Sequence, residues 1–137
     1  MVPDINFLII DSDEAVRKGI EILLRQEGYK VWTVASGQEA LDLANKINFH
    51  IVVTDLNMPG MSGIEILEKL RQKSDNICFV VSTAFPSVKS AVEAMRQGAY
   101  DYIAKPFNSE EIKIILRRAA ERQVLLREAG QKEYYRG

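Results

Sequence analysis

The chain has 137 residues, 47% of them hydrophobic and 27% charged, a balance typical of one globular domain with a single core. Its 18 Lys and Arg residues against 19 Asp and Glu residues leave a formal net charge of -1, which argues against direct binding of nucleic acid or of an anionic membrane. No apolar stretch approaches membrane-spanning length and the N-terminus lacks the basic segment of a signal peptide, so we expect a cytoplasmic protein.

Strand-like and helix-like segments alternate five times along the chain. Most of the predicted strands are continuous apolar runs rich in β-branched residues, a pattern typical of parallel strands covered on both faces. Short connections between strand and helix predict right-handed crossovers and one parallel sheet, hence an α/β fold. The predicted strands are 7–10, 31–35, 51–54, 77–82 and 100–104.

The segments between the strands carry apolar residues at helical spacing. In the fourth of them an apolar face repeats at i, i+3, i+4 and i+7, which is typical of a helix packed on a core. Two helix starts have the pattern of a capping box, and three glycines stand where helices would end. The apolar face consists of Val88, Ala91, Val92 and Met95; the boxes are Ser36 with Glu39 and Ser62 with Glu65; the glycines are Gly28, Gly98 and Gly130.

The last predicted helix is longer than the sheet needs. It begins near Ser109, and its apolar stripe continues through Leu126 before Gly130. We therefore divide the chain into a domain over residues 1–125 and a helical linker or tail over residues 126–137. This tail is too short and too weakly basic to form a DNA-binding module. Its exposed stripe predicts either a frayed helix end or a short coiled-coil seam between two copies.

Four polar residues each end one of the predicted strands: Asp11, Asp55, Thr83 and Lys105. The carboxyl ends of parallel strands meet at one edge of a sheet, which is where open α/β sheets bind ligands. Each residue alone has an ordinary reading as a turn, cap or surface residue. Their coincidence at four strand ends favours a site for a divalent cation and a phosphoryl group.

Asp55 precedes a loop rich in Pro and Gly, so its carboxylate is held on a rigid strand end and faces solvent. A carboxylate can attack phosphorus and form an acyl phosphate, provided that negative charge is neutralised. Mg²⁺ would do this through the carboxylates of Asp11 and Asp55 and the backbone carbonyl of Asn57. Lys105 would place a positive charge on the phosphoryl oxygens, and the Thr83 hydroxyl could donate to one of them.

Four motifs are similar to those of the receiver domain of bacterial two-component response regulators. The resemblance covers about residues 5–125 and implies a flavodoxin-like or CheY-like fold, with a five-stranded parallel sheet of order 2-1-3-4-5 and helices on both faces. The motifs are Ile9-Ile10-Asp11, Thr54-Asp55-Leu56-Asn57-Met58-Pro59-Gly60, Ser82-Thr83-Ala84 and Gly98-Ala99-Tyr100-Asp101-Tyr102-Ile103-Ala104-Lys105-Pro106-Phe107.

This resemblance implies a role for each motif residue. Asp55 would be the phosphoacceptor, Asp11 a metal-site acid and Lys105 the phosphoryl-binding lysine, in a peptide bond to Pro106 that is cis in the family. Thr83 and Tyr102 would be the switch hydroxyl and the switch aromatic. The implied cofactor is Mg²⁺, the implied partner is a sensor histidine kinase, and the protein would be a signalling switch that promotes its own phosphorylation and dephosphorylation without being a conventional enzyme.

The resemblance also bears on the output. The extended last helix is similar to the linker of NtrC-like transcriptional activators, so the chain is either a stand-alone regulator or an excised receiver domain with a transcriptional output. We expect two copies to pair through the face formed by the fourth helix, fifth strand and fifth helix, or through the extended last helix.

One position departs from the family pattern. Ser12 stands where a second metal-binding acid is usual, with Asp13 and Glu14 beyond it. Ser12 or a water molecule could complete a weaker Mg²⁺ site, or Asp13 could turn into the site, although it is equally suited to capping the first helix. In the third alternative the domain has weakened or lost phosphorylation.

Two other classes of protein share single features with this chain. The segment Phe7-Leu8-Ile9-Ile10-Asp11-Ser12-Asp13 is similar to the first motif of haloacid-dehalogenase-type phosphohydrolases, in which Asp11 would be the nucleophile and Asp13 the general acid. A further acidic pair expected after Lys105 in that family is missing. A flavodoxin-like cofactor binder would need a Ser-, Thr- and Gly-rich loop after the first strand, where this chain has acids.

Overall fold

The computed structural model describes residues 4–136, with side chains through residue 129. Five parallel strands form one sheet in the order β2-β1-β3-β4-β5, as predicted. The strands are β1 (Asn6–Ile10), β2 (Lys30–Val34), β3 (Ile51–Asp55), β4 (Cys78–Thr83) and β5 (Asp101–Ala104). The helices are α1 (Glu14–Gln26), α2 (Gly37–Ala44), α3 (Gly63–Lys73), α4 (Val88–Arg96) and α5 (Ser109–Arg136).

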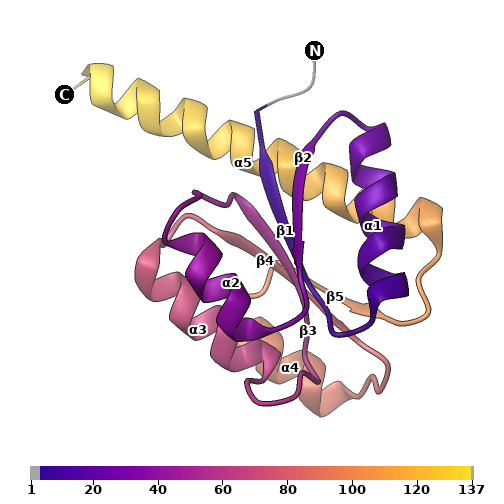
Figure 1. The fold of residues 1–137 in the computed structure, drawn as a ribbon. Helices are drawn as coiled ribbons and strands as arrows, with labels where there is room; N and C mark the ends of the chain where they lie inside the picture. The colour runs from indigo at the N-terminus through magenta and orange to yellow at the C-terminus, as the bar shows by residue number, and fades with distance from the viewer. Residues whose placement is uncertain (1–3, 137) are drawn as a thin grey trace.

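Helices cover both faces of the sheet (Figure 1). Successive side chains of a strand point to opposite faces, so Phe7 and Ile9 of β1 pack in one core with α1 and α5. Leu8 and Ile10 pack in a second core with α2, α3 and α4. Because both faces are covered, the strands carry nearly continuous apolar runs, and for this reason their bounds agree with the predicted ranges to within one residue.

Most of the predicted helix ends are confirmed. The hydroxyl oxygens of Ser36 and Ser62 accept hydrogen bonds of 3.2 Å from the N–H groups of the glutamates three residues later. Gly28 and Gly98 follow helix ends with φ angles of 90° and 95°, in the left-handed region that favours glycine. The prediction for Gly130 was wrong, because α5 continues through Arg136.

The apolar face predicted for α4 does not pack on the core. Val88, Val92 and Met95 are 83%, 43% and 48% exposed, whereas Ala94 is fully buried and Ala91 is half-buried. The prediction was wrong because both sides of this helix are apolar: the small alanines lie toward the sheet and the larger side chains lie outward. α4 therefore presents an apolar stripe to solvent.

The long helix α5 packs on the sheet for longer than its apolar residues indicated. Beyond Ala119 and Ala120, Gln123 is 4% exposed, and its amide nitrogen donates to the carbonyl oxygens of His50 (2.5 Å) and Asn76 (2.6 Å). These carbonyls belong to the segments that enter β3 and β4, so Gln123 joins α5 to the amino edge of the sheet. The helical character predicted for the tail is confirmed through Arg136, and Gly137 lies outside the described residues.

Two further expectations can be compared with the fold. Cys78 is buried in the core as predicted, and this burial raises the pKa of its thiol to about 11, well above physiological pH. Among the residues that the structure describes, no helix combines the length and the apolar character needed to span a lipid bilayer.

Candidate functional site

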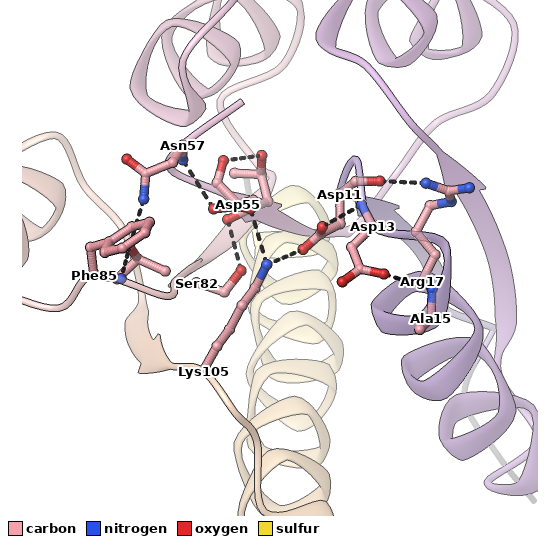
Figure 2. A network of polar contacts seen from close by, with 11 residues as sticks. Asp11, Asp13, Ala15, Arg17, Asp55, Asn57, Ser82, Phe85 and Lys105 are labelled. Carbon is pink, nitrogen blue, oxygen red and sulfur yellow. Dashed lines mark hydrogen bonds and ion pairs between the residues drawn. The ribbon is translucent and has the colours of Figure 1, made fainter. Parts of the chain in front are cut away.

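The four predicted site residues lie at the carboxyl edge of the sheet, and Figure 2 shows three of them, Asp11, Asp55 and Lys105, pointing toward one another. Asp11 follows β1, Asp55 and Thr83 are the last residues of β3 and β4, and Lys105 follows β5. The exposed fractions of Asp11, Asp55 and Thr83 are 2%, 8% and 1%. Residues separated by as many as 94 positions are thus brought together by strand pairing, as the positions at strand ends predicted.

The ammonium group of Lys105 lies between the two carboxylates. Its Nζ is 2.5 Å from Oδ2 of Asp11 and 3.0 Å from Oδ2 of Asp55 (Figure 2). Burial lowers the pKa of the Lys105 ammonium, but the hydrogen bonds and the charges of Asp11 and Asp55 outweigh this effect, and the pKa lies above its ordinary value. Lys105 therefore remains charged and compensates the negative charge of the pair.

Backbone N–H groups orient the second oxygen of each carboxylate. Oδ1 of Asp11 accepts a hydrogen bond of 2.9 Å from the N–H of Asp13, and Oδ1 of Asp55 accepts one of 3.0 Å from the N–H of Asn57. Each carboxylate is thus held on one side by Lys105 and on the other by the loop that follows its own strand. A nearly buried carboxylate with such partners has a fixed direction, which a nucleophile requires.

The hydroxyl oxygen of Thr83 accepts two hydrogen bonds. One comes from the side-chain amide of Asn57 at 2.7 Å and the other from the N–H of Phe85 at 3.0 Å. The sequence singled out Asn57 only for its backbone carbonyl, and this side-chain contact was missed. No pattern in the sequence gives the direction of an amide side chain in a loop.

Tyr102 of β5 points its hydroxyl group at the first turn of α4. The hydroxyl oxygen lies 2.6 Å from the Ser90 hydroxyl oxygen and accepts a hydrogen bond of 3.2 Å from the N–H of Ser87. Ser87 is the N-cap of α4, and its hydroxyl oxygen accepts from the N–H of Ser90. The two serines were missed as partners of Tyr102, although Ser87 at the start of a helical segment was a readable cap.

The loop after β1 shows how Ser12 and Asp13 lie in this structure. Ser12 is exposed, and the Asp13 carboxylate accepts from the N–H of Ala15 at 2.9 Å, which makes it the N-cap of α1. One carboxylate oxygen of Asp13 is therefore engaged in capping α1. Arg17 of α1, also missed, donates to the backbone carbonyl of Asp11 at 2.7 Å and fixes this loop.

The residues at this edge could hold Mg²⁺, but they offer few protein ligands. Within the part of the chain that the structure describes, no three His, Cys, Asp or Glu side chains form a metal-binding cluster. Asp11 and Asp55 still offer two carboxylates, and Mg²⁺ commonly takes one or two of these and keeps several waters. The residues present are therefore compatible with Mg²⁺, with fewer charged ligands than three acids would give.

The chain matches known proteins over most of its length. The model of the response regulator receiver domain matches residues 7–117. The chain is 34% identical over 121 residues to the regulatory protein AtoC of Escherichia coli K12, an alignment that covers 88% of this chain and 26% of AtoC. It is also 34% identical over 105 residues to the cell cycle transcriptional regulator CtrA of Caulobacter vibrioides, covering 77% of this chain and 46% of CtrA.

The solved structures give the same result for the fold. The chemotaxis protein CheY4 of Vibrio cholerae superimposes with a TM-score of 0.80 and 31% sequence identity, over 85% of this chain and 99% of CheY4. The chain spans about a quarter of AtoC and under half of CtrA, but almost all of CheY4. With its sheet order, its clustered strand-end residues and the match over residues 7–117, this chain belongs to the family of response regulator receiver domains.

Proposed function

We propose that Asp55 accepts a phosphoryl group from a partner histidine kinase and that this modification switches the surface of the domain. The observation that carries the proposal is the position of Lys105, whose ammonium contacts both Asp11 and Asp55. Lys105 places a positive charge beside the nearly buried carboxylate of Asp55, and the backbone N–H of Asn57 orients the other oxygen of that carboxylate. This is the arrangement needed for a carboxylate to attack an anionic phosphoryl group.

The chemical step is a transfer between two nucleophiles. A carboxylate oxygen of Asp55 forms a bond to phosphorus while the bond between phosphorus and the kinase imidazole nitrogen breaks, and the electron pair of that bond returns to the nitrogen. Lys105 compensates the charge on the phosphoryl oxygens. Mg²⁺, held by Asp11, Asp55 and the carbonyl of Asn57, would neutralise further negative charge when it is bound.

The proposed switch depends on a movement of the Thr83 hydroxyl group. A phosphoryl group on Asp55 adds about one unit of negative charge and three acceptor oxygens. Thr83 would then donate to one of these oxygens and leave Asn57, and Tyr102 would move into the space that Thr83 vacates. Because Tyr102 contacts Ser87 and Ser90, this change reaches the first turn of α4. The domain would thus shift between two arrangements of these side chains, and contacts to the phosphoryl group would favour the second one.

The output surface that we propose includes the exposed stripe of α4. Phe85 is 77% exposed, and with Val88, Val92 and Met95 it forms a stripe of large apolar side chains; Ile114 of α5 is 46% exposed. Such a stripe is typical of an interaction surface. We propose that a second copy pairs there or along the extended part of α5, where Leu125 and Leu126 are exposed. A transcriptional output is supported by the relative CtrA.

Intact-mass analysis tests the proposal directly. The wild type, incubated with Mg²⁺ and acetyl phosphate, should gain one phosphoryl group, and Asp55→Ala should gain none. Asp75→Ala, which removes an exposed carboxylate from a loop, is the matched control and should behave as the wild type. No gain in the wild type would favour the alternative in which Ser12 has weakened or abolished phosphorylation.

Alanine variants at Asp11 and Asp55 also distinguish a receiver domain from a phosphohydrolase. A phosphohydrolase that uses Asp11 would turn over phosphate esters and would lose this activity in Asp11→Ala but not in Asp55→Ala. The family match and the engagement of Asp13 in capping α1 both favour the receiver function over this alternative.

A further inference from the structure

Helix α4 is attached to the rest of the domain by few side chains. Of its nine residues, all of which the structure describes, Ala94 is the one that is fully buried, and the larger apolar side chains point to solvent. An alanine buries little apolar area, so its burial stabilises the helix position by about 1 kcal/mol at most. The position of α4 therefore depends on the polar contacts at its two ends.

The N-terminal end of α4 is held by groups that belong to the switch. The backbone N–H of Ser87 and the hydroxyl group of Ser90 both contact the Tyr102 hydroxyl. The loop that leads into this end begins at Thr83, whose hydroxyl oxygen accepts from the N–H of Phe85. Movement of Thr83 or Tyr102 therefore breaks or rebuilds the contacts at this end.

The C-terminal end of α4 is closed by a Schellman motif. The N–H of Gly98 donates to the carbonyl of Met95 and the N–H of Ala99 donates to the carbonyl of Ala94, both at 3.0 Å. Gly98 has the positive φ angle, 95°, that this motif requires. The carbonyl groups of Gln97 and Gly98 lie outside the motif and need other donors.

Arg71 of α3 supplies these donors. Its guanidinium donates to the carbonyl of Gln97 at 2.5 Å and to the carbonyl of Gly98 at 3.2 Å. The same group lies 5.5 Å from the ring centroid of the buried Phe79, so it is held in place on β4. A Cβ atom on Gly98 would clash with the guanidinium, which shows how closely the two segments approach. A positive charge at a helix C-terminus also interacts favourably with the helix dipole.

We propose that Arg71 makes the C-terminal end of α4 the fixed end of a pivot. When Thr83 and Tyr102 rearrange, the N-terminal end moves, while the end beside Gln97 and Gly98 stays in place on α3 and β4. Arg71 is thus a positioning residue that converts a local change at Asp55 into a rotation of the apolar stripe. This inference rests on the proposed function, since the rearrangement of Thr83 depends on modification of Asp55.

Backbone amide NMR with beryllofluoride, a mimic of a phosphoryl group on a carboxylate, tests the pivot. Adding Mg²⁺ and beryllofluoride to the wild type should shift the amide signals of residues 84–91 and leave those of residues 95–99 in place. Uniform shifts along α4 would overturn the pivot alone. No shift anywhere in the wild type would contradict the proposed function, and the pivot with it.

The variant Arg71→Gln tests whether Arg71 is the anchor. It removes a charge-assisted pair of hydrogen bonds, so hydrogen exchange of the Gly98 and Ala99 amides should speed up by roughly tenfold or more in the unmodified protein. Beryllofluoride should then shift residues 95–99 as well. Arg118→Gln removes the same charge from an exposed site on α5 and should leave both readouts as in the wild type. Unchanged exchange in Arg71→Gln would overturn the inference.

Discussion

The side-chain amide of Asn57 donates to the Thr83 hydroxyl oxygen at 2.7 Å, so the loop after β3 holds the last residue of β4 in one position. A phosphoryl group on the neighbouring Asp55 would have to draw Thr83 away from this partner. Under the proposed function, Asn57 would therefore restrain the movement of Thr83, although it comes from the same loop that is expected to bind the metal. We therefore expect the strength of the hydrogen bond between Asn57 and Thr83 to affect how readily Thr83 moves toward Asp55.

Asn57→Ala should bind beryllofluoride more tightly. The substitution keeps the backbone carbonyl that we assign to Mg²⁺ and removes the hydrogen bond to Thr83, which contributes about 0.5–1.5 kcal/mol. The apparent affinity should rise by roughly two- to tenfold, because less energy is needed to reach the binding-competent state. Titration followed by the Phe85 amide signal measures this. Asn48→Ala, at an exposed position away from Thr83, is the control. Equal affinities for Asn57→Ala and the wild type would show that this hydrogen bond does not restrain Thr83.

Lys105→Met should destabilise the fold at neutral pH. The side chains of Asp11 and Asp55 are only 3% and 11% exposed, and without Lys105 they form a nearly buried pair of like charges. Removing one partner of a buried ion pair typically lowers the free energy of unfolding by about 3–5 kcal/mol. Urea unfolding measures the loss. Added Mg²⁺ should restore part of it, since a divalent cation can replace the ammonium, whereas Lys89→Met, on the surface, should change little. A Lys105→Met protein as stable as the wild type would show that the pair is not compensated by Lys105.

The pH dependence of this difference has a definite sign. The pKa of Lys105 is raised in the fold, so its contribution is fully present below the ordinary lysine pKa of about 10.4 and is lost as the pH rises through the raised value. The stability difference between the wild type and Lys105→Met should therefore stay constant from neutral pH to about pH 10 and shrink above it. A difference that already fades between pH 7 and pH 9 would contradict the assignment.

Ser12→Asp should bind Mg²⁺ more tightly than the wild type. Ser12 is exposed beside Asp11, and a carboxylate there adds a third negative oxygen donor to a site that has two. We expect a gain of roughly tenfold, about 1.4 kcal/mol, in calorimetric titrations with MgCl₂. Ser12→Asn, which is neutral, should remain near the wild type. Identical affinities for all three proteins would place position 12 outside the metal shell.

Val92→Asp should weaken self-association without unfolding the domain. Val92 lies in the middle of the exposed stripe of α4, so a charge there is solvated in a single copy and is buried if two copies pair through this face. Sedimentation analysis with and without beryllofluoride measures the effect. The matched control is Ile22→Asp, at a 56% exposed position on α1. If Val92→Asp associates as strongly as the wild type and Leu125→Asp associates less, the two copies pair through the extended helix instead.

His50 should make the fold less stable in mild acid. Its Nδ1 accepts a hydrogen bond of 2.9 Å from the N–H of Asn6, so the ring is neutral in the fold. Burial, then the charge of Arg127, lowers the pKa of His50, with Asp4 acting in the opposite direction. The unfolded chain therefore binds the proton first, and stability falls as the pH drops from about 6.5, the ordinary pKa, through the lowered value. His50→Gln should lose less stability than the wild type between pH 7.5 and pH 5. Parallel losses in both proteins would exclude His50 as the source.

The strands and the site edge could be predicted because burial on both faces imposes an unbroken apolar run that ends abruptly at a polar residue. Asp11, Asp55, Thr83 and Lys105 each stand at such an end, and parallel pairing alone brings them together. The sequence also marked the departure at Ser12, but it could not decide what Asp13 does. Capping a helix and binding a metal use the same carboxylate oxygens, and only the backbone path of the loop selects one.

The errors have physical reasons as well. Periodicity finds the apolar side of α4 but cannot tell which of two apolar sides faces the sheet, since Ala94 and Val92 both count as apolar. Helical spacing places Gln123 on the same stripe as Ala119 and Leu126, but the expectation that the core ends before it was wrong. Its polar side chain gave no sign of burial, and it is buried because its amide donates to two backbone carbonyls. The amide direction of Asn57 and the reach of Arg71 across to Gly98 are contacts between distant segments, which a single sequence does not encode locally.

The bond between Gln123 and the entrances of β3 and β4 has a mechanical consequence. Arg127 also donates to the carbonyl of Asp4, and beyond it about nine residues of α5, from Glu128 to Arg136, extend roughly 13 Å at 1.5 Å per residue. This attachment lies at the amino edge of the sheet, opposite Asp55, so the orientation of the sheet sets the direction of the projecting helix. A partner that binds the projecting helix far from Gln123 would be displaced further than the domain itself when the whole domain rotates by a small angle.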